Sequence, residues 1–571
     1  MTASRPALSC LALGLVALTG AAPATAADET LVPHLRKQGT ATQLMVDGRP
    51  FLALSGELGN NSATSLDHVR PVWAQLVEGN LNSVLVAVSW AMVEPAEGRF
   101  DFSLVDGLIR EARRHRLRLV LLWFGSWKNG LSSYVPDWVK RDYQRFPRIR
   151  INDGETLELL STLAPASTDA DAAAFAAFMR HLREVDGQDH TVVMVQIENE
   201  VGVLGDTRDR SDAANEAFRG PVPGALMDHI QQHDGHLVPE LQEAWEAQGR
   251  KLAGSWEEVF GPGKPEDLRI PVRTLSPPLT PEEHKTAWRR VHFYTDELFM
   301  AWHYARYIGA MAKAGKAEYP LPMFVNAWLQ QRDHAWPGTY PSGGPSPQVL
   351  DVWRAAAPAI DILAPDLYAP EFDWWCQRYT RSGNPLFIPE TRGGEAGAAR
   401  VFLAVGQYDA IGFSPFFVER QTGAESPLAR SYGHLAQMSH LILAHQGQGT
   451  MGAVLLDDDL EEQSVRVGDY TIKAERKTSS FFGSRKVDNA YGLFIAIGPS
   501  EYIVAGHGII VRFEPNTPGP ALAGLATVEE GRFVDGRWIP GRRLAGDDTG
   551  QGQSLSLRNM SIQRFTVYRY R

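Results

Sequence analysis

The chain has very little cysteine. Cys10 and Cys376 are the two cysteines among its 571 residues. Cys10 lies in an N-terminal segment that resembles a secretory signal, so removal of that segment would leave Cys376 alone. An intrachain disulfide is then excluded, even in an oxidising compartment. Cys376 follows Trp374 and Trp375, which favours a packed thiol over a nucleophile.

Positive charge is also in short supply. The 56 Lys and Arg residues are outnumbered by 67 Asp and Glu residues, and the formal net charge is −11. This balance argues against nucleic acid as the main partner, because phosphate binding needs basic patches. A neutral carbohydrate is compatible with it. The sequence shows no His-Glu-x-x-His or Cys-x-x-Cys metal signature, and we expect no metal and no cofactor.

Long apolar runs are confined to the N-terminus. Arg5 precedes a mostly apolar stretch from Ala7 to Ala22, and Ala24-Thr25-Ala26 offers a small-residue cleavage site. These features predict a signal peptide over residues 1–26 and a secreted or periplasmic protein. A membrane anchor is the alternative, for which the run is short. No later run is long enough to span a membrane, so we expect no stable membrane insertion.

The length exceeds that of one ordinary domain. From Phe51 onward, apolar runs alternate with helical stretches, the pattern of β/α units. The predicted strands are Phe51–Ser55, Ser83–Ser89, Leu117–Phe124, Val192–Ile197, Pro322–Asn326, Ile360–Ala364, Leu386–Pro389 and Ala410–Pro415. Eight such runs predict an α/β fold, a (β/α)8 TIM barrel over residues 27–440. An Asp47-Gly48 hairpin would precede it, and residues 206–281 would form a long insertion.

The character of the sequence changes near Met451. Short apolar runs such as Tyr491–Gly498 and Ile509–Phe513 are separated by Gly-containing turns. This pattern predicts a C-terminal antiparallel β-sandwich over residues 441–571. Support of the barrel, polysaccharide binding and a contact within a homodimer all remain open as its role.

Two predicted strands end in carboxylates. Val192–Ile197 runs into Glu198, Asn199 and Glu200, and the seventh strand runs into Glu390. Catalytic groups of a (β/α)8 barrel sit at the C-terminal ends of its strands. Cleavage of a glycosidic bond needs two carboxyl groups that face each other. The pair therefore indicates a glycosidase, whereas either end alone is equally typical of a strand that runs into a polar loop.

Several segments together resemble one glycosidase family. They are Leu54-Ser-Gly-Glu57, Trp90 with Glu94-Pro95, Gly98-Arg-Phe-Asp-Phe102 and Val195-Gln-Ile-Glu-Asn-Glu200. In this order they resemble the family-35 β-galactosidases over about residues 40–440, in a bacterial branch with an extra C-terminal β domain. The resemblance implies that Glu200 is the acid/base, that Glu390 is the nucleophile and that Asn199 binds the sugar's 2-hydroxyl.

The remaining expected substrate contacts are less specific. The resemblance places Glu57, Trp90 and Glu94 near the sugar, and the positions of Trp127, Asn129, Trp328 and Tyr368 at or beyond strand ends add further candidates. Tyr368 would donate to Glu390, face the sugar or simply pack. The segment Gly125-Ser-Trp-Lys-Asn-Gly130 departs from the family pattern, because the usual acidic residue is absent. Val201 replaces the family's usual tyrosine.

The expected activity is that of a retaining exo-β-galactosidase. It would release terminal non-reducing β-D-galactose from oligo- or polysaccharides, such as plant cell-wall xyloglucan, by double displacement. The alternatives are a β-glucosidase or β-mannosidase on the same barrel, or a non-catalytic glycan-binding protein. The expected partners are a carbohydrate substrate and, as an open alternative, a second copy of the chain.

Overall fold

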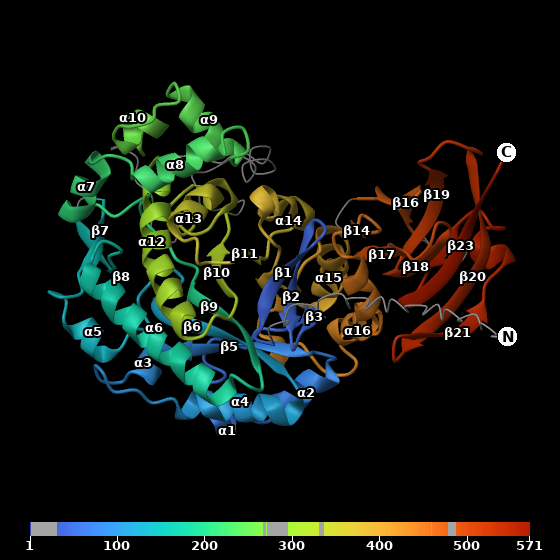
Figure 1. Cartoon of the computed structure of the whole chain (residues 1–571), viewed down its shortest axis with the longest axis horizontal. Helices are drawn as coiled ribbons and strands as arrows, with labels where there is room; N and C mark the ends of the chain where they lie inside the picture. Colours follow the sequence, from blue (N-terminus) through green and yellow to red (C-terminus); the bar gives the residue numbers. More distant parts are fainter. Residues whose placement is uncertain are drawn as a thin grey trace.

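The protein consists of two lobes, a large barrel and a smaller β-sandwich (Figure 1). The computed structural model describes residues 1, 31–152, 154–265, 270, 295–330, 336–457, 460–477 and 487–571. The predicted signal peptide therefore lies outside the described residues except for Met1. No helix in these ranges is both long and apolar enough to cross a membrane.

Eight parallel strands form the barrel. Their order around it is β4-β13-β12-β11-β10-β9-β6-β5. The bounds are β4 (Ala53–Leu54), β5 (Ser83–Ser89), β6 (Arg118–Lys128), β9 (Val192–Asn199), β10 (Met323–Trp328), β11 (Ile362–Leu367), β12 (Ile388–Thr391) and β13 (Gly412–Pro415). Glu57, just beyond β4, bridges to Leu85 on one side and to Phe416 on the other, and this closes the barrel.

One helix follows each barrel strand and packs on the outside. These helices are α2 (Val72–Glu78), α4 (Ser103–His115), α6 (Pro165–Asp186), α12 (Thr295–Glu318), α13 (Leu350–Ala356), α14 (Phe372–Tyr379), α15 (Gly394–Tyr408) and α16 (Pro427–His445). The spacing of apolar residues explains the packing. In α4, Val105, Leu108, Ile109 and Ala112 recur at helical intervals and are all buried.

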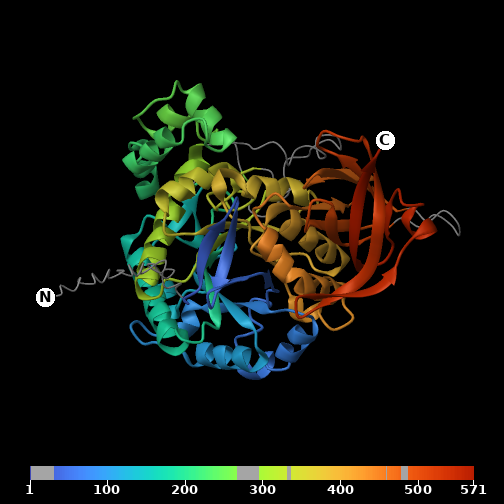
Figure 2. The same cartoon turned by 45° about the vertical axis from the view of Figure 1, so that its right-hand side comes forward.

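Extra elements decorate the loops that follow the strands. Short helices α1 (Leu66–Val69), α3 (Trp90–Val93) and α5 (Asp137–Arg141) and the hairpin of β7 (Arg148–Ile151) and β8 (Glu155–Leu160) lie in the first three units. The predicted insertion contains α7 (Asp212–Arg219), α8 (Gly224–Gln232), α9 (Pro239–Ala247) and α10 (Trp256–Phe260). These four helices form a projection at one edge of the barrel (Figures 1 and 2). The end of the insertion falls outside the described residues.

A small antiparallel sheet closes the bottom of the barrel. Its strands are β1 (His34–Gln38), β2 (Ala41–Val46) and β3 (Arg49–Phe51), with β2 in the middle. Leu44 and Val46 of β2 share a core with the barrel interior, including Phe324 and Phe387. The predicted Asp47-Gly48 hairpin is present between β2 and β3, but β1 was not anticipated.

The C-terminal lobe is a sandwich of two antiparallel sheets. One has the order β14-β17-β18-β23-β20-β21 and the other β15-β16-β19-β22. The bounds are β14 (Met451–Leu456), β15 (Glu462–Val467), β16 (Tyr470–Arg476), β17 (Ala490–Ala496), β18 (Glu501–His507), β19 (Ile509–Pro515), β20 (Leu522–Val534), β21 (Arg537–Arg543), β22 (Leu555–Leu557) and β23 (Ser561–Tyr570). Alternating side chains such as Ile472, Val511 and Phe565 form its core.

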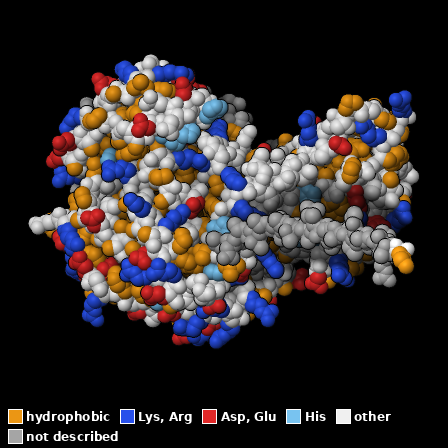
Figure 3. All heavy atoms as spheres, viewed as in Figure 1, with side chains coloured by type: hydrophobic (Ala, Val, Ile, Leu, Met, Phe, Trp, Pro, Cys, Tyr) orange, Lys and Arg blue, Asp and Glu red, His pale blue; other side chains and the backbone are white. Residues whose placement is uncertain are grey.

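The six-stranded sheet also packs against the barrel. Leu493 on β17 contacts Gly406 of α15, and Phe533 on β20 stacks edge-on against His440 of α16. The two lobes therefore share an apolar interface. Because α16 continues to His445, the sandwich begins at Met451 and not at the predicted residue 441. On the face shown in Figure 3, acidic and basic side chains are interspersed over both lobes.

The predicted fold class is confirmed: a barrel of eight parallel strands followed by antiparallel sheets. The second predicted strand matches β5 at both ends, and the third is longer than predicted, because β6 continues to Lys128. Runs of buried β-branched and aliphatic residues made the barrel strands recognisable. The extension of β6 to Lys128 was not predicted, because polar residues occupy the end of this strand.

Candidate functional site

The two predicted catalytic carboxylates lie together at the mouth of the barrel. Glu200 directly follows β9, and Glu390 belongs to β12. Each offers a carboxylate oxygen within 4.8 Å of the other and of an oxygen of Asp366 on β11. Glu57 lies just beyond the first barrel strand, and the charges of Glu390 and Glu200 help to raise its pKa, after burial as the larger cause. We call Glu57, Glu200, Asp366 and Glu390 the mouth cluster.

The backbone at the end of β9 is held in an uncommon conformation. Glu198 has φ of 61° and Glu200 has φ of 47°. The left-handed region is costly for a residue with a Cβ, and such residues persist where surrounding contacts enforce them. Here the amide of Glu200 donates to Oδ1 of Asn326 at 2.9 Å. The kink re-aims successive side chains, so that Glu198 and Glu200 enter different environments.

Glu200 is surrounded by groups that set its protonation. Nδ2 of Asn129 donates to Oε2 of Glu200. Burial, and after it the charges of Glu390 and Glu200, raise the pKa of Asp366 well above its usual value. Burial and then the charge of Glu390 raise the pKa of Glu200 to about 7, against the opposing effect of Lys128.

Glu390 has one oxygen held and one oxygen unengaged. The hydroxyl of Tyr368 donates to Oε1 at 2.5 Å, which is one of the three arrangements expected for Tyr368. Oε2 is buried and has no hydrogen-bond partner among the described residues. Arg392 lies nearby, but its Nε donates to the carbonyl of Tyr368. A carboxylate with one fixed oxygen and one available oxygen suits nucleophilic attack.

Two further polar side chains at the mouth have unused hydrogen-bonding capacity. Both oxygens of Glu57 and Nδ2 of Asn199 are buried without a partner among the described residues. Glu57 is 1% exposed and Asn199 is 0% exposed. Buried polar atoms are nearly always paired in folded proteins, so their alignment at one mouth indicates a site for a polyhydroxylated ligand.

A bulge in β6 brings two more side chains to this mouth. Trp123 pairs with Ile197 and Lys128 pairs with Asn199, so β6 contains three more residues than β9 over this interval. After the bulge, Asn129 and Gly130 form a tight turn with φ of 53° and 65°, flanked by hydrogen bonds between Lys128 and Leu131. Lys128 and Asn129 thereby face Asn199 and Glu200.

A second acidic pair supports the bulge from behind. Glu198 accepts from the amides of Ser126 at 3.0 Å and Trp127 at 2.6 Å. Asp171 of α6 accepts from Nε1 of Trp123 and from Oγ of Ser126. Burial, together with the Asp171 charge and hydrogen bond, raises the pKa of Glu198 well above its usual value. We call Glu198 and Asp171 the rear cluster.

Three predicted substrate contacts use their polar groups within the protein. The Trp127 ring is fully buried against Tyr304 and Tyr307 of α12, and its indole donates to the carbonyl of Leu160. Its assignment as a sugar-stacking residue is therefore corrected to a core role. Trp90 donates to Glu94, whose other oxygen accepts from the amide of Gly98. The polar groups of Trp90 and Glu94 are thus used within the protein.

The other predicted contacts lie at the mouth. Glu57, Asn129, Asn199 and Tyr368 have the contacts given above, and their roles toward a sugar stay predictions. Trp328 ends β10 at the level of Asp366 and is partly exposed. It remains a prediction as a stacking residue.

Sequence reasoning missed Lys128, Asn326, Asp366 and Asp171. Three of these stand at the C-terminal ends of β6, β10 and β11, so the rule that found Glu200 and Glu390 could have found them. Asp171 lies within α6, where an acidic residue gives no such signal. The three carboxylates within 4.8 Å could attract a cation, and the Lys128 ammonium already supplies positive charge beside them. We assign no metal.

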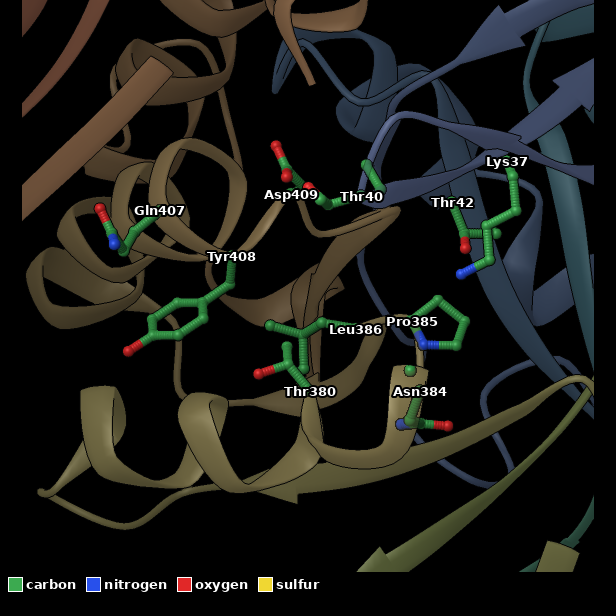
Figure 4. A pocket seen from close by; sticks show the side chains of 12 residues that line it. Lys37, Thr40, Thr42, Thr380, Asn384, Pro385, Leu386, Gln407, Tyr408 and Asp409 are labelled. Atoms are coloured by element: carbon green, nitrogen blue, oxygen red, sulfur yellow. The ribbon is translucent and has the colours of Figure 1, made fainter. Parts of the chain in front are cut away.

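A separate cavity of about 210 Å³ lies at the opposite end of the barrel (Figure 4). Lys37 and Thr42 of the small sheet form one wall, and Leu386 and Asp409 form another. Leu386 precedes β12 and Asp409 precedes β13, so this cavity adjoins the N-terminal ends of the strands. That face of a (β/α)8 barrel serves stability and not catalysis.

A barrel with two carboxyl groups this close at its mouth has the architecture of a retaining glycoside hydrolase. The comparison with protein families agrees. Residues 68–304 match the model of glycoside hydrolase family 42, described as beta-galactosidase. Residues 428–556 match a model described as a domain of unknown function (DUF5597).

Individual relatives cover parts of the chain. A beta-galactosidase of Xanthomonas manihotis is 30% identical over 203 residues, which make up 34% of this chain and 30% of that protein. The chain thus spans about a third of this curated relative. A family-42 β-galactosidase structure from G. stearothermophilus, in a catalytic mutant, has 11% identity, a TM-score of 0.47 and coverage of 91% and 98%. A β-galactosidase from Bacillus circulans sp. alkalophilus has 14% identity, a TM-score of 0.43 and coverage of 69% and 57%.

These findings correct the expected resemblance to family 35. The family model that matches the barrel segment is that of family 42. The segment Val195–Glu200 carried much of that resemblance, because its Asn-Glu pair was expected to supply the acid/base and a ligand of the sugar's 2-hydroxyl. Most glycosidase families use a pair of carboxyl groups, so a strand end that carries a carboxyl group does not distinguish one family from another.

Proposed function

We propose that the protein is a retaining exo-β-galactosidase that releases terminal non-reducing β-D-galactose. The observation that carries this proposal is the pair Glu200 and Glu390, with oxygens within 4.8 Å. Retaining glycosidases hold their two carboxyl groups about 5 Å apart, whereas inverting enzymes leave room for a water. The match of residues 68–304 to the beta-galactosidase model supports the sugar.

In the first step, Glu390 attacks the anomeric carbon through its unengaged Oε2 while Tyr368 holds Oε1. Glu200 gives its proton to the glycosidic oxygen, and the C–O bond to the aglycone breaks. The pKa of about 7 keeps a useful fraction of Glu200 protonated near neutrality. The product is a galactosyl ester on Glu390 together with the released alcohol.

In the second step, water cleaves this ester. Esterification removes the charge of Glu390, which is the second contributor to the raised pKa of Glu200. The pKa of Glu200 consequently falls, and its carboxylate becomes the base that takes a proton from the attacking water. Water attacks the anomeric carbon from the side of the departed aglycone, so galactose leaves with its configuration retained and both carboxyl groups are restored.

The natural glycan is a separate part of the proposal. The predicted signal sequence motivates export to the periplasm or medium, where plant-type polysaccharides such as galactosylated xyloglucan would be met. Turnover of aryl β-galactoside, β-glucoside and β-mannoside, beside xyloglucan fragments and galactan, compares the candidate sugars directly. Faster turnover of the glucoside or mannoside would replace galactose in the proposal.

The nucleophile is tested by Glu390→Gly with an aryl β-galactoside. Removal of the carboxylate should lower turnover by at least about 10⁴-fold, because the covalent step is lost. Azide should restore turnover by filling the space and should yield β-galactosyl azide. Glu395→Gly is the matched control, because Glu395 is exposed at the start of α15 and pairs with Arg430. Full activity of the Glu390 variant would overturn the assignment.

A further inference from the structure

Lys128 is a buried cation at a mouth made of carboxylates. It is 7% exposed, and its ammonium lies 4.9 Å from the centre of the Phe124 ring. Burial alone would lower the pKa of Lys128, but the charges of Glu200, Glu390, Glu57 and Asp366 outweigh burial and raise it. Lys128 is therefore charged at any pH at which the site would work.

The ammonium of Lys128 donates to Oδ1 of Asn199 at 2.7 Å. This contact has a directional consequence, because an ammonium has three donors and no acceptor. It can face only the oxygen of the Asn199 amide. The amide nitrogen must then point the other way, and Nδ2 is indeed buried and without a partner among the described residues.

The pairing of β6 with β9 fixes the position of Lys128. Lys128 and Asn199 are paired across β6 and β9 after the bulge. The amide of Asn129 also donates to the carbonyl of Asn199 at 3.2 Å. The turn at Asn129-Gly130 and the rear cluster fix this part of β6 on both sides. Because the backbone is fixed on both sides of Lys128, its side chain is suited to orient a neighbouring group.

We propose that Lys128 is a positioning residue that holds the Asn199 amide with its NH2 group toward the substrate's 2-hydroxyl. This inference rests on the proposed glycosidase function. The hydrogen bond to the 2-hydroxyl strengthens in the oxocarbenium-like transition state, so correct orientation of the amide affects kcat/KM. Without Lys128, the amide can rotate and present its oxygen instead.

Lys128 has a second measurable effect on the same site. The groups facing Glu200 are Glu390, Asp366, Asn129 and Lys128, and among them Lys128 is the cation that lowers the pKa of Glu200. Loss of this positive charge raises the pKa of Glu200 further. The fall of kcat/KM on the basic side of the pH profile then moves to higher pH. A residue that only fills space would not move this limb.

The test compares Lys128→Met, which keeps the length and loses donor and charge, with Lys128→Arg, which keeps both. Asn199→Ala is the reference for a lost amide, and Lys140→Met is the control at an exposed lysine that bonds the carbonyl of Ser133. For each folded variant, kcat/KM is measured for an aryl β-galactoside and its 2-deoxy analogue across pH. A second, uncharged variant, Lys128→Leu, serves if the Met variant does not fold.

In the wild type, the 2-hydroxyl should increase kcat/KM by about 100-fold. Lys128→Met should reduce this ratio at least about tenfold, toward the value of Asn199→Ala, and shift the basic limb upward. Lys128→Arg should return the basic limb of the pH profile to its wild-type position and recover part of the effect of the 2-hydroxyl on kcat/KM. An unchanged ratio and limb in Lys128→Met, with normal turnover by the wild type, would overturn the role of Lys128 alone. No turnover of any glycoside by the wild type would overturn the proposed function and this inference together.

Discussion

The mouth cluster and the rear cluster lie back to back at the end of β9, and they use similar residues differently. Glu198 and Glu200 are two residues apart, both have positive φ, and burial raises the pKa of both. The rear cluster uses its oxygens on the amides of Ser126 and Trp127. The mouth cluster keeps oxygens of Glu57 and Glu390 unengaged.

One property, unused hydrogen-bonding capacity, distinguishes the mouth cluster from the rear cluster. Burial and a raised pKa occur in both clusters, so neither is sufficient to identify catalytic carboxyl groups. Unused hydrogen-bonding capacity occurs beside Glu200 and not at Glu198. A fully paired carboxyl group stabilises the backbone, whereas an unengaged one is available for a ligand.

Among the variants that distinguish the two clusters, Glu200→Gln should have the largest effect on activity. Loss of the acid/base should lower kcat/KM by about 10³-fold for an alkyl or unactivated aryl galactoside. The loss should be much smaller for a dinitrophenyl galactoside, since that leaving group needs no proton. Steady-state kinetics on both substrates provide the measurement, and equal losses on both would contradict the acid role. The midpoint of denaturant unfolding should stay at or above that of the wild type.

Glu198→Ala should lower stability, whereas Glu200→Gln should lower activity. The change leaves two buried amides without an acceptor, which costs about 3 kcal/mol of unfolding free energy. Urea unfolding followed by fluorescence measures it, with Glu198→Gln, which retains an acceptor oxygen, as the milder control. Unchanged stability in the Ala variant would show that the rear cluster does not support the bulge of β6.

Tyr368→Phe should have a smaller effect, confined to activity. The hydroxyl donates to Oε1 of Glu390, and a hydrogen bond to a charged group contributes about 2 kcal/mol. We therefore expect a loss of about tenfold in kcat/KM and no measurable loss of stability. A wild-type rate in this variant would mean that Tyr368 does not hold the nucleophile.

The last prediction concerns a gradual fall of kcat/KM with rising pH. Glu200 must be protonated in the first step, and its pKa is raised to about 7. Raising the pH through 7 removes that proton, so kcat/KM should fall tenfold per pH unit well above 7. A basic limb that persists unchanged in Glu200→Gln would assign it to another group.

Much of the barrel could be predicted because its strands are buried on both faces. Strongly apolar runs such as Ser83–Ser89 and Val192–Ile197 predict these strands. The polar end of β6 could not be recognised in this way. Its bulge depends on Asp171, which lies about 45 residues away in sequence and reaches Ser126 only in the folded chain. Trp127 was misplaced for the same reason, because α12 covers its ring.

The candidate site shows a similar limit. Glu200 and Glu390 could be predicted because strand order brings the ends of β9 and β12 to one mouth. The partner of each polar atom could not be predicted, since Glu94 and Glu57 are both acidic residues near strand ends. Folding pairs Glu94 with Trp90 and leaves Glu57 unengaged. Hydrogen-bond pairing depends on three-dimensional contacts that a single sequence does not specify.

The central claim is that Glu200 and Glu390 form a pair spaced for double displacement. The most direct measurement is the anomeric configuration of the galactose first released from an aryl β-galactoside, followed by proton NMR before mutarotation. We expect β-galactose to appear first and then to convert to the equilibrium mixture. Initial release of α-galactose would show inversion and would contradict the assignment of Glu390 as nucleophile.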